Sequence, residues 1–358
     1  MENKLKVTAI IMAGGKGERF WPKSRSGLPK QFLKLTNTNQ TMIQETVDRV
    51  ASIVKLEDIY VVTNKQYENI ITAQLPDVPK ENIILEPEGK NTAPCIAVAA
   101  AYIKKKNAEA VVLTLPADHL VKNKQIYEKT LKAAIEKATE EANIVTIGIV
   151  PSYAETGYGY IKFKAASDNI YKVEKFVEKP DLELAKEYLA TGEYLWNSGM
   201  FIWKLSTIWE KFMVLLPDIY KGMELILDSI GTDNEADVLA KQYSMFKAES
   251  IDYGIMERSD NIFTIVGAFG WDDVGSWLAL ERINQTDSCA NVISGNVVTC
   301  GVSASIVCGG DRLIAMVGVA DLVVVDCDDV ILICDKASTS DVKVVIDKLK
   351  SAGKQQYL

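Results

Sequence analysis

The chain has 358 residues, of which 48% are hydrophobic and 25% charged, and this composition suits a globular protein with one large and one small domain. Its net charge of −8 argues against non-specific binding to nucleic acid or to an anionic membrane. No apolar run is long enough to span a membrane, and the polar first residues lack a signal-peptide core, so we expect a cytoplasmic protein.

The six cysteines show no Cys-x-x-Cys spacing, and the sequence contains one histidine, His119. This composition leaves little for a zinc site. We therefore expect the cysteines to be reduced, buried residues.

An apolar, β-branched run near the start breaks abruptly at Gly14 and Gly15. The pattern predicts a buried strand that leads into a loop at the edge of a sheet. With Gly17, these glycines leave backbone amides accessible to phosphate groups. The basic residues that could neutralise a polyphosphate are Lys16, Arg19 and Lys30. The loop is thus predicted to bind a nucleoside triphosphate.

Two common glycine motifs do not match this loop. No window supplies the P-loop pattern of Gly, four residues and Gly-Lys-Ser/Thr, and the dinucleotide fingerprint would need glycine at Phe20. The remaining alternative is a strand-to-loop turn without a ligand. Arg19 and the segment 29–32 argue against that alternative.

Residues 1 to about 150 alternate between strand and helix patterns. The pattern predicts a parallel sheet with helices on both faces and ligands beyond the carboxyl ends of the strands. The predicted strands are 59–63, 83–85, 110–115 and 144–150, and the predicted helices include 92–105 and 127–142.

Two loops of this half follow predicted strands. In the first, Asn91 or Thr92 suits the N-cap of the helix that follows. In the second, Asp118 stands at a strand tip, where a carboxylate suits Mg²⁺ better than it suits a core. His119 is expected to have a structural or supporting role, because a phosphate nucleophile needs no deprotonation.

Beyond residue 150 the alternation loosens into an expected substrate-facing extension. Residues 156–161 are predicted to form a strand whose small residues let a sugar ring approach the backbone. Residues 173–180 are predicted to form another strand, ending in the hydroxyl acceptor Glu178 and the cation Lys179. A third strand, 262–269, precedes Asp272 and Asp273, of which only one is expected to face a metal.

After residue 284 the sequence changes to short β-branched runs followed by an expected helix at 340–351. Such runs are typical of the rungs of a small β-helix or sheet. They carry no evident catalytic constellation, so packing, dimerisation or a lid is the role expected of this part.

Several motifs together resemble the mannose-1-phosphate guanylyltransferases, a family of sugar-nucleotide pyrophosphorylases. The Trp-Pro and Gln-Phe pairs are the more diagnostic parts, since a bare GGxGxR is shared by many nucleotidyltransferases. The matching segments are AGGKGERFWP (13–22), PKQF (29–32), EP and NTAP (86–94), LPADH (115–119), GYGYI (157–161), FVEKP (176–180), WNSGMF (196–201) and WDDVGSW (271–277).

The resemblance implies an α/β fold with a Rossmann-like, mixed but mainly parallel sheet in a catalytic domain at 1–285. It also implies a C-terminal domain at 286–358 that is similar to a left-handed β-helix. The implied reaction joins GTP and mannose 1-phosphate to give GDP-mannose and diphosphate, with Mg²⁺. A homodimer is the assembly that we expect for the protein.

The resemblance also assigns roles to individual residues. The catalytic residues would be Arg19, Lys30 and Lys16; the nucleotide-binding residues Ala13, Gly14, Gly15, Gly17, Glu86, Asn91, Thr92 and Pro116; the sugar-phosphate-binding residues Gly159, Glu178, Lys179 and Asn197; and the metal ligands Asp118 and Asp273. Glu86 is the candidate for reading guanine, because one carboxylate can accept both N1–H and N2–H₂, and Glu88 is the reserve. Asp272 occupies a variable position of the motif.

Two other functions stay open from the sequence. A relative that uses glucose 1-phosphate and another nucleotide would share the glycine loop and both aspartates. A non-catalytic sensor of sugar nucleotides could share the fold. Phe20, Trp21 and the segment 91–94 argue against the first alternative, and the retention of Arg19 and Lys30 argues against the second.

Overall fold

A computed structural model describes residues 6–15, 17–164 and 169–358. The chain forms two compact units, the first from residues 1–14, 46–117 and 121–271 and the second from 15–45, 118–120 and 272–358. This grouping differs from the boundary predicted at residue 285. Residues 15–45 join the C-terminal part because Phe20, Trp21 and Leu33 share a buried cluster with Trp277 and Ile306.

The first unit is built on one mixed sheet. The strands β1, β2, β3 and β4 are paired in parallel with one another, and β6 is paired in parallel with β10. β9 is antiparallel to both β4 and β6, and β8 is antiparallel to both β10 and β7. The strand order is β3 (Ile83–Glu86), β2 (Ile59–Asn64), β1 (Val7–Met12), β4 (Val111–Pro116), β9 (Tyr194–Lys204), β6 (Ile144–Ile149), β10 (Ile262–Val266), β8 (Ile170–Val177) and β7 (Tyr160–Lys164). The predicted Rossmann-like, mainly parallel sheet is confirmed.

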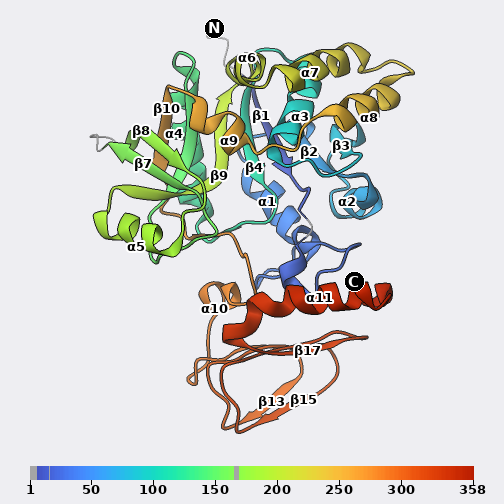
Figure 1. The fold of residues 1–358 in the computed structure, drawn as a ribbon, viewed down its shortest axis with the longest axis vertical. Coiled ribbons are helices and arrows are strands. Elements are labelled where there is room, and N and C mark those ends of the chain that lie inside the picture. The colour runs from blue at the N-terminus through green and yellow to red at the C-terminus, as the bar shows by residue number, and fades with distance from the viewer. Residues whose placement is uncertain (1–5, 16, 165–168) are drawn as a thin grey trace. The chain divides into compact units, whose positions relative to one another are not determined.

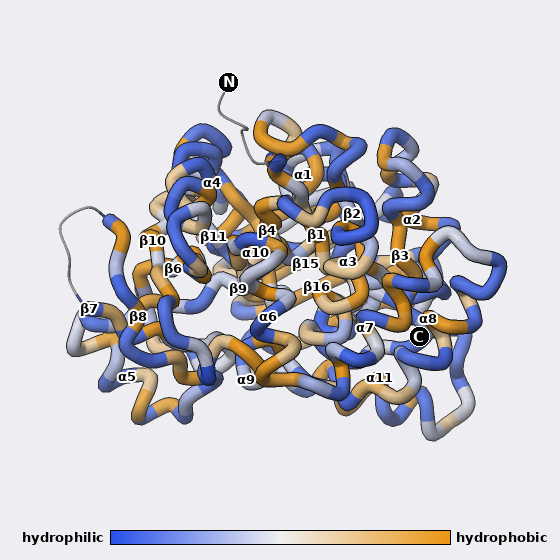
Figure 2. The backbone as a smooth tube through the Cα atoms, turned by 90° about the horizontal axis from the view of Figure 1, so that it is seen from above, coloured by the Kyte–Doolittle hydropathy of each residue, from blue (hydrophilic) through white to orange (hydrophobic). Residues whose placement is uncertain are grey.

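Helices cover this sheet on both faces. In Figure 2, α4 lies on one side of the central strands, and α6 and α7 lie on the other. The helices of the unit are α2 (Glu68–Gln74), α3 (Thr92–Lys106), α4 (Lys124–Thr139), α5 (Leu182–Thr191), α6 (Leu205–Leu215), α7 (Pro217–Ser229), α8 (Glu235–Met245) and α9 (Ile251–Gly254), and α1 (Met42–Val50) crosses the unit boundary. All six residues of β6 are buried, as expected for a strand that is covered on both faces.

Several predicted elements begin elsewhere than expected, among them β8, which begins at Ile170 and not at residue 173. The strand predicted at 156–161 begins only at Tyr160, because the preceding residues form a loop in which the Tyr160 hydroxyl donates to the carbonyl of Glu155. The helix predicted at 127–142 is α4, which begins three residues earlier because the side chain of Asn123 accepts from the N–H of Ile126.

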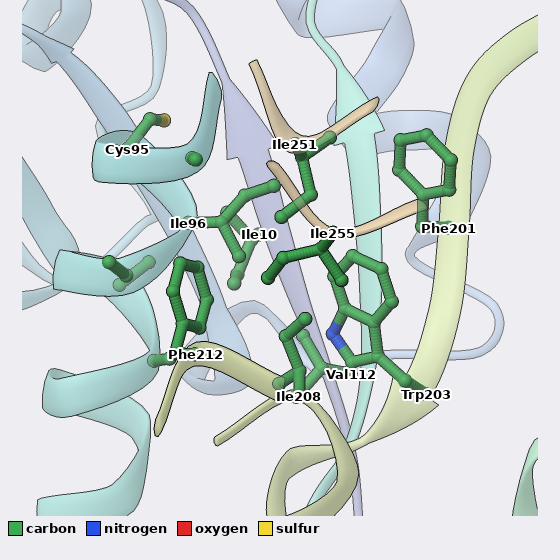
Figure 3. Packing of buried hydrophobic residues seen from close by; sticks show 14 of the residues in the cluster. Ile10, Cys95, Ile96, Val112, Phe201, Trp203, Ile208, Phe212, Ile251 and Ile255 are labelled. Atoms are coloured by element: carbon green, nitrogen blue, oxygen red, sulfur yellow. The ribbon is translucent and has the colours of Figure 1, made fainter. Parts of the chain in front are cut away.

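The main core lies between the sheet and the helices α3, α6 and α9. Figure 3 shows Ile96 of α3 and Phe212 of α6 pointing toward Ile10 of β1, with Trp203 of β9 beside them. Ile251 of α9 is 1% exposed and belongs to the same cluster, so the core anchors this short helix.

The second unit consists largely of stacked short strands. β12 (Val292–Ser294), β14 (Ile306–Cys308) and β16 (Leu322–Asp326) are parallel neighbours, and β17 (Ile331–Asp335) is antiparallel to β16. Between them in the sequence, β13 (Val297–Cys300) pairs in parallel with β15 (Ile314–Val317). Successive turns of chain thus feed two sheets alternately, which confirms the predicted β-helix-like domain.

The remaining elements are short, apart from a C-terminal helix. They are β5 (Leu120–Val121), β11 (Trp271–Asp272), α10 (Ala279–Ile283) and α11 (Val342–Ser351). α11, the long red helix in Figure 1, buries Val342 and Ile346 in the same cluster as Leu332 of β17. In the part of the chain that the structure describes, no helix combines the length and the apolar character needed to cross a membrane.

The cysteines follow the prediction only in part. All six are free thiols, as expected. Cys95 and Cys308 are buried, and Cys327 and Cys334 are partly exposed. Burial was predicted wrongly for Cys289 and Cys300, which are exposed. They lie on the surface of the small β-helix, where little interior is available.

Candidate active site

The second unit contains a cavity of about 720 Å³ at the phosphate-loop segment. Four of the predicted catalytic and metal-binding residues line it: Arg19, Lys30, Asp118 and Asp273. Arg19 lies in a 3₁₀ turn, Glu18–Phe20, whose Phe20 packs against Trp277 with ring centroids 5.1 Å apart. Residues that are far apart in the sequence therefore line one cavity.

Lys30 is the centre of this group. Its side chain is 8% exposed, and its Nζ lies 2.8 Å from Oδ2 of Asp118 while also donating to the backbone carbonyl of Asp273. Burial alone would raise the pKa of Asp118, but the charges of Lys30 and His119, together with hydrogen bonds to the carboxylate, outweigh it and leave this pKa lowered. Asp118 is thus held as a carboxylate.

The glycine loop owes its shape to two contacts. Gly17 has a φ of 59°, and a Cβ at this position would lie 2.5 Å from the backbone nitrogen of Lys30. Any side chain at position 17 would therefore displace Lys30. The carbonyl of Gly15 accepts from Nε2 of Gln31 at 3.0 Å. Lys16, the third predicted catalytic residue, lies outside the described residues.

The two adjacent aspartates face different partners. Asp272 accepts two hydrogen bonds from Arg282, at 2.6 and 3.0 Å, and a third from the N–H of Val274. Asp273 lines the cavity, and its Oδ1 accepts from the N–H of Gly275 at 3.1 Å. Of the two, Asp273 is the one that lines the cavity.

Asp118 and Asp273 fit Mg²⁺ as a partial ligand set. Mg²⁺ prefers oxygen ligands, and it is commonly held by one or two carboxylates together with substrate phosphates and water. Nowhere in residues 6–15, 17–164 and 169–358 do three or more His, Cys, Asp or Glu side chains form a metal-binding group. His119 Nε2 lies 3.9 Å from Asp118 Oδ1, which suits the supporting role expected of it.

In the first unit, the predicted loops leave the same edge of the sheet. The register pairs Met12 with Pro116 and Asn64 with Glu86, so the carboxyl ends of β1, β2, β3 and β4 lie together. Ala13 follows β1 directly, and its N–H donates to the carbonyl of Val62 on β2 at 2.8 Å. This is the edge at which ligands bind in open α/β sheets.

Glu86 is a buried carboxyl at this edge. It is 3% exposed, and its Oε1 accepts from the hydroxyl of Tyr243, while its Oε2 would lie 3.1 Å from a Cβ at Gly14. Burial raises its pKa to about 7, although hydrogen bonds from Tyr243 and Cys95 oppose the rise. The reserve candidate, Glu88, is 53% exposed and lies 3.2 Å from the ammonium of Lys90.

Asn91 and Thr92 start α3 as predicted. Asn91 is the N-cap, with a φ of 71°, and its side chain accepts from the N–H of Thr92. The hydroxyl of Thr92 accepts from the N–H of Ile251 at 2.8 Å. The loop predicted to bind the nucleotide base is therefore hydrogen-bonded, through Thr92, to the first residue of α9.

The predicted sugar-binding residues also lie together. The N–H of Asn197 donates to the carbonyl of Gly159 at 2.8 Å. A Cβ at Gly159 would lie 2.8 Å from Oε2 of Glu178, so glycine is needed there for the approach of this carboxylate. Lys179 is 60% exposed and pairs with Glu178 at 3.0 Å.

Sequence reasoning missed Asp252, which lies beside these residues. Its Oδ1 accepts from Nδ2 of Asn197 at 2.8 Å, and this fixes the orientation of the amide. Burial and the nearby Glu178 raise the pKa of Asp252 to about 6. The indication available in the sequence was an acidic residue close to two isoleucines, Ile251 and Ile255. The structure shows that both isoleucines are buried.

Family comparison agrees with this architecture. Residues 8–289 match the family model for nucleotidyl transferase, and residues 295–349 match that for the MannoseP isomerase/GMP-like beta-helix domain. The first match covers most of the chain, so the fold and the cavity belong to a nucleotidyl transferase.

Individual relatives narrow the family further. The chain is 39% identical to a putative mannose-1-phosphate guanylyltransferase of Vibrio cholerae, over 97% of this chain and 75% of the relative. It is 40% identical to a mannose-1-phosphate guanylyltransferase of Salmonella montevideo, over 98% of this chain and 76% of that relative. The chain therefore belongs to the mannose-1-phosphate guanylyltransferase family.

Solved structures show the same fold. A Thermus thermophilus protein described as a mannose-1-phosphate geranyltransferase superposes with a TM-score of 0.88 at 34% identity, covering 97% of this chain and 100% of that one. A Helicobacter pylori protein described as a mannose-6-phosphate isomerase superposes with a TM-score of 0.61 at 28% identity, covering 75% of this chain and 100% of that one.

Proposed function

We propose that this protein transfers GMP from GTP to mannose 1-phosphate, forming GDP-mannose and diphosphate. The family supports the reaction, because the relatives that match nearly the whole chain carry the name of this activity. The observation that carries the proposal within the molecule is the convergence of Arg19, Lys30, Asp118 and Asp273 on one cavity.

The reaction is a displacement at the α-phosphorus of GTP. A phosphate oxygen of mannose 1-phosphate forms a bond to this phosphorus, and the bond from the phosphorus to the bridging oxygen of the β-phosphate breaks. The bonding electrons leave with diphosphate. The nucleophile is already an anion, so catalysis consists of positioning and charge neutralisation.

Arg19 and the amides of the glycine loop are assigned to the β- and γ-phosphates. Arg19 is exposed within the cavity, where its guanidinium can offer a fork of donors. Gly14, Gly15 and Gly17 leave the loop backbone uncovered by side chains. Lys16 is assigned the same role from the family resemblance alone.

Lys30 and Lys179 are assigned to the reacting phosphates, Lys30 to the α-phosphate of GTP and Lys179 to the phosphate of the sugar. Lys30 is nearly buried and fixed by Asp118, so it can present its charge without reorganisation. Lys179 is exposed and paired with Glu178, whose side chain is only 12% exposed.

Asp118 and Asp273 are the residues that would hold Mg²⁺. The ion supplies Lewis-acid neutralisation of phosphate charge when it is bound. Lys30 holds the carboxylate of Asp118 in its ionised form, which is the form a cation requires.

Base selection is assigned to the loop that follows β3. Glu86 is the proposed acceptor for the two guanine donors, with Glu88 in reserve. Asn91 and Thr92 shape the loop, since they cap α3 and hold the N–H of Ile251. Ala13 and Pro116 end or follow neighbouring strands at the same sheet edge and are assigned to the nucleotide.

Sugar binding is assigned to Gly159, Glu178 and Asn197. Asn197 and Glu178 offer a donor and an acceptor for hydroxyl groups, and Asp252 acts as a positioning residue because it orients the amide of Asn197. Neither glucose 1-phosphate transfer nor a sensing role is favoured by the names of the relatives. A homodimer and a cytoplasmic location stay predictions.

The experiment that tests the function is a substrate panel. The purified protein is mixed with Mg²⁺, one of GTP, ATP, UTP or dTTP, and either mannose 1-phosphate or glucose 1-phosphate, and diphosphate release is measured. We expect the highest kcat/KM for GTP with mannose 1-phosphate. A higher value for glucose 1-phosphate would favour the first alternative, and no release from any pair would favour a sensor.

A further inference from the structure

The cavity that holds the predicted catalytic residues has a second wall, which comes from the C-terminal segment. Thr339, Ser340, Val342 and Lys343 line the same 720 Å³ space as Arg19. Sequence patterns alone do not predict this contribution, because the runs after residue 284 carry no phosphate-binding motif.

Helix α11 is firmly attached to the phosphate-loop segment. Val342 and Ile346 are each 3% exposed and belong to the buried cluster that contains Phe20 and Trp21. Beyond the helix, the indole Nε1–H of Trp21 donates to the carbonyl of Tyr357 at 2.7 Å. The start of the helix is therefore held in place relative to the loop.

The burial pattern of α11 determines where Lys343 lies. Val342 and Ile346 are four residues apart and occupy the face turned to the core. Lys343 is the next residue after Val342, so it is rotated away from that face, and it is exposed where the helix borders the cavity.

The charges in the cavity leave Lys343 available to an anion. Lys30 is paired with Asp118, and Glu18 lies 3.4 Å from Lys350 at the other end of α11. Lys343 has no ion-pair partner in the part of the chain that the structure describes. The neighbouring Ser340 is exposed, and its hydroxyl, which lies 3.5 Å from Oδ1 of the adjacent Asp341, can rotate to donate to a phosphate oxygen.

We propose that Lys343, helped by the hydroxyl of Ser340, binds the β- and γ-phosphates of the nucleotide and the diphosphate released from it. The C-terminal unit is then part of the substrate-binding machinery. This inference rests on the proposed function, since it names further residues for the leaving group of that reaction.

The test compares Lys343→Ala with Lys348→Ala. Both remove an exposed lysine from α11, but Lys348 does not line the cavity. Losing one charge-assisted phosphate contact should raise the KM for GTP, and the KM for diphosphate in the reverse reaction, by about tenfold. The KM for mannose 1-phosphate should stay within about twofold in both variants, and Lys348→Ala should resemble the wild type.

Two further variants sharpen the result. Lys343→Arg keeps a cation and should recover most of the affinity for diphosphate, whereas Lys343→Gln should not. The inference is overturned if Lys343→Ala and Lys348→Ala have the same KM for GTP and for diphosphate in a folded, active protein. An inactive wild type would instead contradict the proposed function, so the two failures are distinguishable.

Discussion

Glu86 in the first unit and Asp118 in the second are both carboxyl groups at strand ends, but their surroundings shift their pKa values in opposite directions. Glu86 is buried next to a phenol and a thiol, and its pKa rises to about 7. Asp118 is only partly buried, with 33% of its side chain exposed, and the charges of Lys30 and His119 together with hydrogen bonds bring its pKa below the ordinary value in spite of desolvation. Burial without a cation favours the neutral acid, and burial with one favours the carboxylate. The proposed reading of both guanine donors requires the ionised form of Glu86, and the proposed metal site requires the ionised form of Asp118, which the surroundings of Asp118 favour.

The largest effect is expected at the ionised site. Asp118→Asn or Asp273→Asn keeps the shape but removes charge from the proposed Mg²⁺ ligands, so kcat should fall by at least ~10²-fold. The kcat of each variant is measured from steady-state diphosphate release at saturating substrate concentrations.

Asp272→Asn is the matched control for this pair. Because Asp272 binds Arg282 instead of lining the cavity, its replacement should lower stability by about 1 kcal/mol and leave kcat within about threefold. A severe loss of kcat in Asp272→Asn together with a mild loss in Asp273→Asn would show that the two roles are reversed.

The next effect is expected at Glu86. Glu86→Gln replaces a group that can accept both guanine donors, so kcat/KM for GTP should fall by ~2 kcal/mol, roughly thirtyfold, while the already poor reaction with ATP hardly changes. The GTP to ATP ratio of kcat/KM measures it. An equal loss for both nucleotides would mean that Glu86 supports the loop through Tyr243 without reading the base.

The two carboxyl groups also predict opposite pH effects on stability. The folded state binds the Glu86 proton more tightly than the unfolded state does, so this group lowers stability as pH rises from about 4.5 to about 7, by on the order of 3 kcal/mol. Asp118 has a lowered pKa, so its contribution is present above about pH 4 and is lost in more acidic solution.

Urea denaturation of wild type and Glu86→Gln at pH 5 and pH 7.5 measures the Glu86 contribution. The variant should lose less stability between these two pH values than the wild type does. Identical changes in both proteins would refute the assignment of this pH dependence to Glu86.

The smallest effect is expected at Asp252. Asp252→Ala removes the acceptor that orients Asn197, so the KM for mannose 1-phosphate should rise by about fivefold with the KM for GTP unchanged. Asp260→Ala, at an exposed aspartate nearby in the sequence, should change neither constant. An equal rise in the KM for GTP would instead indicate that the replacement disturbs α9 and its surroundings in general.

Local patterns predicted most of the fold. The β-branched runs predicted β1, β2, β3, β4 and β6 to within a residue or two, because a strand buried on both faces must be apolar along its length. The parallel order then places the loops after these strands at one sheet edge, as the register of Met12 with Pro116 shows.

Long-range partners could not be predicted in the same way. Tyr243 bonds to Glu86 across 157 residues, and Asp252 bonds to Asn197 across 55 residues. Neither pair has a fixed spacing or a local pattern. The grouping of residues 15–45 with the C-terminal strands likewise depends on a buried cluster around Trp277, which composition alone does not reveal.

The joining of GTP to mannose 1-phosphate is tested most directly by phosphorus NMR of the protein with both compounds and Mg²⁺. The spectrum resolves the sugar nucleotide from diphosphate and from GDP. We expect GDP-mannose and diphosphate to appear in equal amounts, and neither to form when mannose 1-phosphate is omitted. Formation of GDP and free phosphate without GDP-mannose would contradict the proposed reaction.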